Sequence, residues 1–149
     1  GILGDTVPLE LNAKELVHRN NKNSELTVYG YTPMMVSVQC VQKTMDHCNH
    51  ACVQYVLKDR YQKEFRGVCS CEFCYNTIYN TLPTSLLKEK EKAEKLGVKA
   101  YRLSFTTETQ QETEKIVRAF VDVYLRGQKP DGQMQTEETT KGHFQRGVE

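Results

Sequence analysis

Six cysteines are the residues of this chain best suited to do chemistry, and all of them fall between positions 40 and 74. They form a pair, a group of three and one separate residue: Cys48 and Cys52, then Cys69, Cys71 and Cys74, with Cys40 ahead of both groups. Thiolates at such short spacings are typical ligands of metal ions and iron-sulfur clusters. If the first pair lies on a helix, its two side chains share a face, because residues four apart are neighbours there. The cysteines therefore predict a bound metal ion or cluster.

Two alternatives to a metal site stay open for the cysteines. An even number of cysteines is also typical of a disulfide framework, although such domains are usually shorter and secreted, and the chain opens without an apolar leader. Reduced thiols that are simply buried in a core are the second alternative.

The spacing does not name the metal. His47 and His50 flank Cys48, and zinc accepts mixed cysteine and histidine ligands, whereas iron-sulfur clusters are mostly bound by thiolates alone. The pattern matches neither the paired Cys-x2-Cys of a zinc ribbon nor the Cys-x2-Cys-x2-Cys run of bacterial ferredoxins. Zinc and an iron-sulfur cluster both remain candidates.

Composition narrows the classes of protein. The chain has 149 residues, a formal net charge of +1 and 38% hydrophobic residues, which suits a domain with an apolar core. No apolar run approaches the roughly 20 residues that a membrane helix needs. A near-neutral charge does not require a nucleic-acid partner, although it can contain a local basic patch. Free cysteines without a secretion signal predict the reducing cytoplasm.

The elements that must position the cysteines begin with a strand–helix–strand unit, residues 1–33. We expect a strand at 7–11, a short helix after Asn12 and a strand at 26–29. Asn12 and Glu15 have the spacing of a capping box at the helix start. Two strands joined by a helix pair in parallel, so this unit predicts a parallel sheet.

The cysteines lie in an insert at residues 34–80. Residues 55–57 and 63–68 predict a hairpin, and residues 75–79 are rich in strand-forming side chains. The insert otherwise has little apolar periodicity. We therefore expect an irregular segment that a bound metal orders.

Residues 81–127 predict a helix–strand–helix unit. Pro83 and Thr84 are expected to open a helix that Gly97 closes, followed by a strand at 100–105. Thr109 and Glu112 form a second capping-box pattern before a helix that continues to Gly127. Residues 128–149 are expected to be a polar loop and tail.

Together these four segments predict one α/β domain with a largely parallel sheet. The chain is shorter than the roughly 250 residues of a complete eight-stranded barrel. We therefore expect a partial TIM-barrel-like sheet that carries the cysteine-rich irregular insert. The absence of a methionine at Gly1 adds the expectation that the chain is a fragment of a longer protein.

Several ordered motifs resemble the collagenase-like peptidase family, family U thirty-two. They are VPLELNAKEL (7–16), VYGYTPMMVSVQC (28–40), DRY (59–61), EF (64–65), CYN (74–76), YRLSFT (101–106) and TKGHFQRGVE (140–149). The resemblance covers nearly the whole chain. It implies the later part of a longer protein, so that the remainder of the same polypeptide would be a partner.

The resemblance also implies a function. The family carries the label of putative proteases, a hydrolase class, while some relatives look like factors for oxygen-independent hydroxylation of RNA bases or quinone precursors. Those relatives hold a four-iron four-sulfur (4Fe-4S) cluster on four cysteines. The cofactor-binding residues implied here are Cys40, Cys48, Cys52, Cys71 and Cys74. As metal ligands we expect Cys40, Cys48, Cys52 and Cys74, with Cys69 or Cys71 as alternates, and Pro33 stands where the family has a further cysteine.

We thus expect a cluster-dependent factor acting on RNA or a small aromatic precursor. The alternatives are a genuine peptidase acting on peptides and completed by the missing part, or a zinc-stabilised interaction module. The sequence contains neither a His-Glu-x2-His nor a Gly-x-Ser-x-Gly motif. Arg102 and Arg146 are expected to hold an anionic substrate group, with His143 as a proton donor or ligand. The fragment alone is expected to be inactive.

Overall fold

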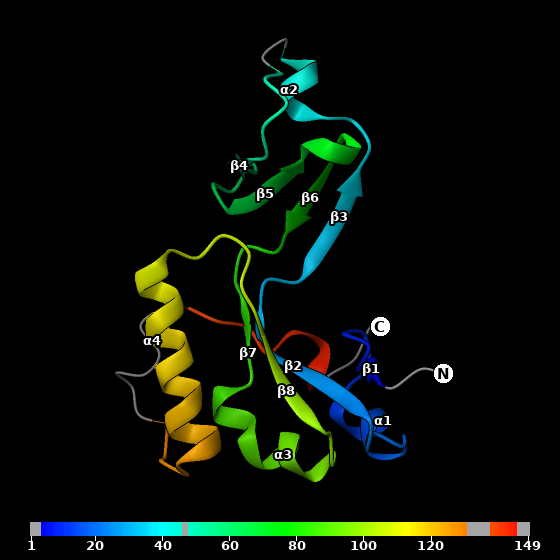
Figure 1. Cartoon of the computed structure of the whole chain (residues 1–149), viewed down its shortest axis with the longest axis vertical. Coiled ribbons are helices and arrows are strands. Elements are labelled where there is room, and N and C mark those ends of the chain that lie inside the picture. Colours follow the sequence, from blue (N-terminus) through cyan, green and yellow to red (C-terminus); the bar gives the residue numbers. More distant parts are fainter. Residues whose placement is uncertain (1–3, 46–47, 131–137, 146–149) are drawn as a thin grey trace. The chain divides into compact units, whose positions relative to one another are not determined.

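The computed structural model describes residues 4–45, 48–130 and 138–145, which form a mixed α/β structure (Figure 1). The chain divides into two compact units. We call Gly1–Gly30 with Leu82–Glu149 the αβ unit, and Tyr31–Thr81 the cysteine unit. Each unit contains one four-stranded sheet, so the predicted α/β class is confirmed. Neither sheet closes into a barrel within the described residues.

The sheet of the αβ unit is built around one long strand, β2 (Ser24–Gly30). It pairs in parallel with β1 (Asp5–Thr6) and with β8 (Ala100–Ser104), and antiparallel with β7 (Thr84–Ser85). The register with β8 runs from Glu25 opposite Ala100 to Gly30 opposite Ser104. The predicted parallel pairing is therefore confirmed in this unit.

Local sequence signals set the helices of the αβ unit. Helix α1 (Ala13–Val17) begins with the predicted capping box of Asn12 and Glu15. Helix α3 (Lys90–Lys95) follows the 3-10 turn η2 (Leu87–Glu89) and ends before Gly97, whose φ of 64° suits a residue without a Cβ. Helix α4 (Gln110–Phe120) starts with the second predicted capping box, of Thr109 and Glu112, and continues as the π-helical turn η3 (Val121–Leu125).

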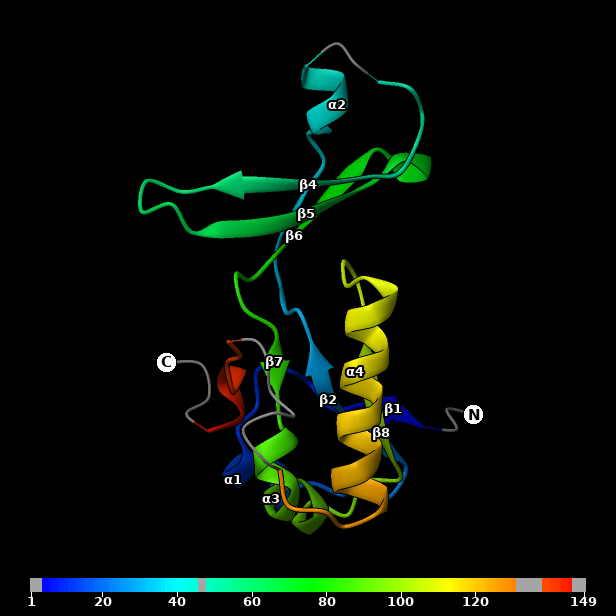
Figure 2. The same ribbon diagram turned by 90° about the vertical axis from the view of Figure 1, so that its left-hand side faces the viewer.

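Apolar side chains from all of these elements pack into one core. Figure 2 shows α4 running along the sheet of this unit. The buried members of the core are Val7, Leu16, Leu26, Val28, Tyr29, Leu86, Leu87, Ala93, Leu96, Ala119, Phe120, Val123 and Phe144. No helix among the described residues is both long and apolar enough to cross a membrane.

The cysteine unit is an antiparallel sheet in the order β3-β6-β5-β4. Its strands are β3 (Pro33–Ser37), β4 (Val53–Lys58), β5 (Glu64–Ser70) and β6 (Tyr75–Tyr79). Helix α2 (Val41–Thr44) follows β3, and the 3-10 turn η1 (Cys71–Phe73) joins β5 to β6. Strands β4 and β5 form the predicted hairpin, which Figure 2 shows as a long projection.

The cysteine region departs from the sequence prediction. We expected an irregular insert, whereas the described residues form four regular strands. Two of these strands, β3 and β4, place apolar side chains such as Met34, Val36 and Val56 at exposed positions. The alternation of apolar and polar residues that normally identifies a half-buried strand is consequently weak in the sequence.

Two predictions in the αβ unit were wrong. The strand expected at residues 7–11 does not form, and the strand of this segment is β1 at Asp5–Thr6 instead, because the chain turns at Leu9 and Glu10 and Pro8 has no N–H to donate to a ladder. The helix expected at Pro83 and Thr84 begins later, because Thr84 and Ser85 pair with β2 instead.

The expected polar tail is partly built into the fold. Thr140 forms a bridge with Thr84, and its backbone N–H donates to the Pro83 carbonyl at 2.9 Å. The 3-10 turn η4 (Gly142–Phe144) then buries Phe144 in the core of the αβ unit. Phe144 is the one buried apolar residue among the described residues of this segment, which is why its sequence resembles a loop.

Candidate metal centre

Cys40 and Cys69 meet in the cysteine unit, although they are 29 positions apart. Cys69 lies on β5 and is fully buried, and Cys40 directly precedes α2. Their Sγ atoms are 3.5 Å apart. A contact between two buried thiols places two soft ligands within reach of one metal ion.

Asn76 explains why the Cys40 segment lies against the sheet. It stands opposite Cys69 in the β5–β6 register, so both side chains point to the same face. Its Nδ2 donates a hydrogen bond of 2.6 Å to the carbonyl of Gln39, the residue before Cys40. Asn76 is 1% exposed, so this bond forms away from solvent and fixes the position of Cys40.

A second group contains two cysteines and a histidine. The ligand atoms of Cys48, His50 and Cys71 all lie within 4.8 Å of one another. Cys71 opens η1 and is buried, while Cys48 and His50 come from the loop between α2 and β4 and are exposed. This loop thus closes over the end of β5, and a Cys-Cys-His group of this kind can hold a metal ion.

Two residues around this group adopt an uncommon backbone conformation. His50 has a φ of 56° and Cys74 a φ of 52°, in the left-handed region that non-glycine residues seldom enter. Such positions often occur at functional sites, where the surrounding structure imposes them. At His50 and Cys74 the backbone changes direction close to Cys48 and Cys71.

Electrostatic interactions connect all six thiols. Burial raises the pKa of Cys69 to about 12, and the Cys40 thiol and the charges of Cys71 and Cys52 act in the same direction. Burial also raises the pKa of Cys71, as do the charges of Cys48 and Cys74. Thiolates gathered this closely repel one another, so a cation that binds them relieves the repulsion.

The pKa of Cys40 shifts in the opposite direction. The backbone amide of Lys43, at the start of α2, lowers the pKa of the Cys40 thiol, and the Cys69 thiol adds to this effect. The two thiols share a hydrogen bond, and the Lys43 amide favours the thiolate form of Cys40. Cys40 is thus the member of the pair prepared to bind a metal as a thiolate.

The donor set fits a metal centre. Sulfur atoms bound about 2.3 Å from one tetrahedral zinc ion lie about 3.8 Å apart, close to the distance between Cys40 and Cys69. Six thiols also exceed the four that an iron-sulfur cluster needs. Several buried polar atoms beside the cysteines also have no hydrogen-bond partner within the described part of the chain: Gln42 Oε1, Tyr55 OH and Asn76 Oδ1.

The expected ligands are all in the cysteine unit, in two sets. Cys40 is close to Cys69, and Cys48 is close to Cys71. Cys69 and Cys71, which we expected as alternate metal ligands, are therefore each the buried partner of an expected ligand. Cys52 and Cys74 are exposed. Sequence reasoning placed Tyr55 in the hairpin of this insert but did not single it out as a functional residue, because the predicted partner strand, residues 63–68, ended before Cys69.

The other candidate residues belong to the αβ unit. Arg102 on β8 forms an ion pair of 2.5 Å with Glu25, and a hydrogen bond from Thr6 and the contact with Arg102 lower the pKa of Glu25. His143 lies in η4, and Arg146 lies outside the described residues. An anionic substrate would have to compete with Glu25 for Arg102.

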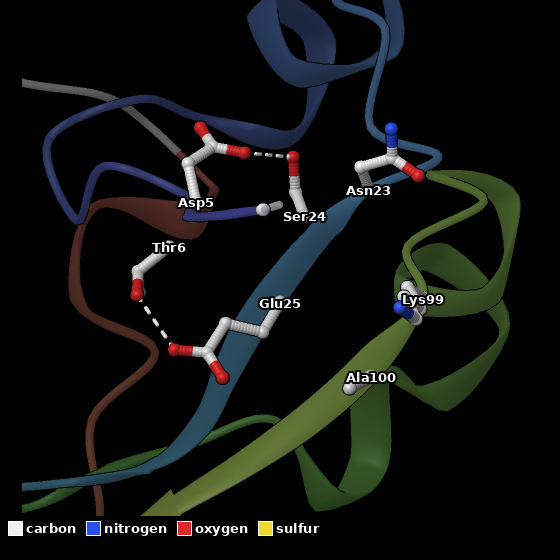
Figure 3. Close-up of a pocket in the computed structure, with 8 residues that line it drawn as sticks. Asp5, Thr6, Asn23, Ser24, Glu25, Lys99 and Ala100 are labelled. Carbon is white, nitrogen blue, oxygen red and sulfur yellow. Dashed lines mark hydrogen bonds between the residues drawn. The ribbon is translucent and has the colours of Figure 1, made fainter. Parts of the chain in front are cut away.

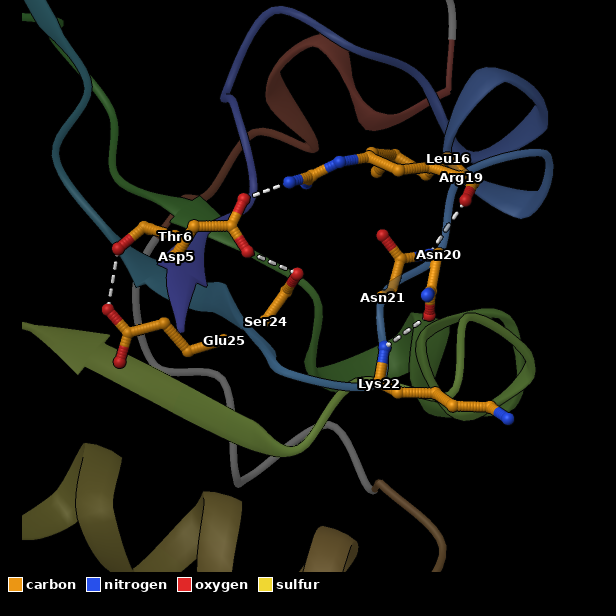
Figure 4. A network of polar contacts seen from close by, with 9 residues as sticks. All are labelled: Asp5, Thr6, Leu16, Arg19, Asn20, Asn21, Lys22, Ser24 and Glu25. Atoms are coloured by element: carbon orange, nitrogen blue, oxygen red, sulfur yellow. Dashed lines mark hydrogen bonds and ion pairs between the residues drawn. The ribbon is translucent and has the colours of Figure 1, made fainter. Parts of the chain in front are cut away.

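A hollow of about 350 Å³ lies at the amino ends of β1, β2 and β8 (Figure 3). Its polar side chains pair among themselves: Ser24 donates to Asp5 at 2.5 Å and Thr6 donates to Glu25 at 2.6 Å. Figure 4 shows Arg19 bound to the same Asp5. Ligands of parallel sheets usually bind at the carboxyl ends of the strands, so we interpret this network as structural.

Comparisons of the chain with protein-family models, with curated proteins and with solved structures found no match. The case for a metal centre therefore comes from the cysteine unit itself. Its strongest element is the group of Cys48, His50 and Cys71, which has room for an ion but does not select one metal.

Proposed function

We propose that this chain belongs to the collagenase-like peptidase family and holds an iron-sulfur cluster on its cysteines. The cluster would serve oxygen-independent hydroxylation of RNA or of a small aromatic precursor. One observation carries the metal-binding part of this proposal: the ligand atoms of Cys48, His50 and Cys71, which come from separate segments of the cysteine unit, lie within 4.8 Å of one another. The family and the reaction come from the sequence resemblance.

The chemistry of the thiols supports a redox centre. Hydroxylation without oxygen gas needs an electron carrier close to the substrate, and a cluster bound by thiolates supplies one. Burial around Cys40, Cys69 and Cys71 restricts solvent, which together with hydrogen bonds to sulfur sets the reduction potential of such a centre.

The αβ unit would supply part of a substrate site. Its parallel strands β1, β2 and β8 would belong to a partial TIM-barrel-like sheet completed by the remainder of the polypeptide. Working groups of such sheets lie beyond the carboxyl ends of the strands. Arg102, His143 and Arg146 remain the proposed substrate-binding or proton-donating residues, and RNA or a peptide remains the proposed partner in the cytoplasm.

A zinc-stabilised interaction module is the second candidate. Two observations favour it: His50 belongs to the closest ligand group, and the Cys40–Cys69 distance of 3.5 Å suits two ligands of a single ion. In this case the metal would hold the antiparallel sheet together and take no part in a reaction. Proteolysis is supported by the sequence resemblance alone.

Elemental analysis and an absorption spectrum of the anaerobically purified chain test the proposal. Iron and sulfide near about four each per chain would support the redox factor. Stoichiometric zinc in a colourless protein would replace it with the interaction module. A protein with no metal at all would contradict both and return attention to a free cysteine nucleophile.

Single Cys→Ser variants at all six positions sharpen this test. A four-iron cluster bound by thiolates predicts that four of the six variants lose most of their iron and two retain it. Met45→Ser is a matched control, because Met45 is an exposed sulfur-containing side chain of the same unit. Equal metal content in all six cysteine variants would exclude the cysteines as the binding site.

A further inference from the structure

Tyr55 on β4 has a buried hydroxyl oxygen with no hydrogen-bond partner in the described part of the chain. Native proteins satisfy nearly all buried polar groups, because an unsatisfied one keeps the full cost of its desolvation. The Tyr55 oxygen is therefore open to a new acceptor, and a loaded metal centre on the neighbouring cysteines would supply one.

The strand register places Tyr55 on the face of the sheet that carries Cys69. Tyr55 stands opposite Gly67, and Val53 stands opposite Cys69. Directly opposed residues point to the same face, and so do residues two apart on one strand. Tyr55, Gly67 and Cys69 therefore share one face, with Tyr55 and Cys69 as diagonal neighbours within reach of an aromatic side chain.

Gly67 lets the ring cross β5. A Cβ atom at this position would lie 2.3 Å from Cε2 and Cζ of Tyr55 and 2.8 Å from its hydroxyl oxygen. The hydroxyl end of the ring thus lies directly over the backbone of β5, where any larger residue would collide with it. The glycine brings the phenol to the strand segment that ends at the buried thiols.

The charges that act on Tyr55 agree with this placement. Burial raises the pKa of the phenol, and the charges of Cys69 and then Cys40 raise it further. A phenol has a usual pKa of about 10, so it carries its proton at neutral pH in any case. Tyr55 is then a hydrogen-bond donor, and the two thiols that affect it are acceptors once they are deprotonated.

We propose that the Tyr55 hydroxyl donates a hydrogen bond to the metal-bound sulfur of Cys69 or Cys40, and that this bond tunes the centre. The inference rests on the proposed binding of a metal by these thiols, whichever metal it is. A hydrogen bond to a ligating thiolate stabilises its negative charge. It therefore strengthens binding and, in an iron-sulfur cluster, favours the more negative reduced state and raises the reduction potential.

Tyr55→Phe tests this inference, because it removes the hydroxyl and keeps the ring. Tyr61→Phe is the matched control, since Tyr61 is 67% exposed beyond β4 in the same hairpin. The whole chain is titrated with Co²⁺, and bound Co²⁺ is then displaced by Zn²⁺ in the presence of a competing chelator. Tyr55→Phe should weaken metal binding by about 10- to 100-fold, the usual effect of losing a partner of a metal ligand, while Tyr61→Phe should match the unmodified chain.

Two further readouts separate a hydrogen bond from a structural role. The thiolate-to-Co²⁺ charge-transfer band should keep the intensity of the same number of thiolates but move in wavelength in Tyr55→Phe alone. In iron-loaded protein, the same variant should have a more negative midpoint potential. Equal affinity, band position and potential in Tyr55→Phe and the unmodified chain would overturn the inference and leave the metal centre standing. An unmodified chain that binds neither Co²⁺, Zn²⁺ nor iron would overturn both.

Discussion

The two units of this chain bury different kinds of side chain. The αβ unit buries a continuous set of aliphatic and aromatic residues, among them Leu16, Leu86 and Val123. The buried residues of the described cysteine unit are Tyr31, Cys40, Gly67, Cys69, Cys71 and Asn76, so half of them are cysteines. Small units that bury little apolar surface usually depend on disulfides or metals for their stability. The comparison shows that apolar packing holds the αβ unit, and we propose that a metal bound by the cysteines stabilises the other unit.

Exposed apolar residues sharpen this contrast. In the cysteine unit Met34, Val36 and Val56 are each more than half exposed, although all three lie on strands. In the αβ unit the strand β2 buries Leu26, Val28 and Tyr29. Apolar area that stays exposed adds no hydrophobic stabilisation, so these side chains stabilise the antiparallel sheet less than Leu26, Val28 and Tyr29 stabilise the sheet of the αβ unit.

Removal of the metal should produce the largest difference in stability between the two units. A chelator under reducing conditions should release the backbone amides of β3, β4, β5 and β6 to hydrogen exchange, because metal binding and folding are coupled in small metal-dependent units. Amides of β2 and α4 should keep their protection. Hydrogen exchange read by mass spectrometry measures both units in one sample.

Restoring the metal provides the control for this experiment. Added Zn²⁺ or reconstituted cluster should return protection to the cysteine unit, and Mg²⁺, which prefers oxygen ligands, should not. If β5 stays protected in the metal-free chain, apolar and backbone interactions suffice and the proposed contrast between the two units is wrong.

Truncation in the apolar core should have the next largest effect. Leu86 is 1% exposed in the core of the αβ unit, so Leu86→Ala should lower the free energy of unfolding of this unit by about 2–5 kcal/mol. Val36→Ala is the matched change in the cysteine unit, where the side chain is 63% exposed, and it should cost less than about 0.5 kcal/mol. Denaturant titration with the metal bound measures both. Equal losses would show that β3 is packed as tightly as the core.

The same contrast explains how much of the fold the sequence could predict. Both capping boxes, the strands β2 and β8 and the hairpin of β4 and β5 were predicted, because each rests on local signals between neighbouring residues. The strand at Thr84 and Ser85 was not, because only its pairing with Tyr29 and Gly30 makes it a strand. Tertiary pairing of this kind leaves no pattern in a short segment.

The candidate site was predictable in part for a similar reason. Cysteine spacing alone located the region, but it could not show that Cys69 lies against Cys40 and Cys71 near His50. Those contacts depend on the register of β5 with β6 and on the hydrogen bond from Asn76 to Gln39. Long-range register is a property of the folded sheet, so the sequence predicted the donors and left their grouping open.

A pH titration tests a smaller effect, the contribution of the Glu89 carboxylate to the stability of the αβ unit. Burial by itself would raise the pKa of Glu89, but hydrogen bonds from Lys141 and Lys92 hold it below its usual value. The folded carboxyl therefore binds a proton more weakly than the unfolded one. Its contribution is present above the unfolded pKa of 4.5 and is lost as the pH falls through the lowered value.

Glu89→Gln should thus destabilise the αβ unit by about 1–3 kcal/mol at pH 7, since it replaces the charged acceptor of two lysine hydrogen bonds by a neutral amide. The difference from the unmodified chain should shrink as the pH falls below 4.5, and denaturant titrations across this range measure it. Glu91→Gln is the matched control, because Glu91 is an exposed carboxylate two residues further on, in α3. A constant difference at every pH would mean that the carboxyl acts through shape and not through charge.

The smallest predicted effect compares the starts of two helices. Thr109 caps α4 through its side-chain hydroxyl, whereas Cys40, at the same position of α2, offers the Lys43 amide only a thiol sulfur, which is a weak acceptor. Thr109→Ala should therefore cost the αβ unit about 0.5–2 kcal/mol, and exposed Gln111→Ala on the same helix should cost nothing measurable. Cys40→Ala should reduce the stabilisation that added Zn²⁺ gives, because it removes a proposed ligand, as denaturant titration with and without Zn²⁺ would show. If Zn²⁺ stabilises Cys40→Ala as much as the unmodified chain, Cys40 is a buried structural residue and not a ligand.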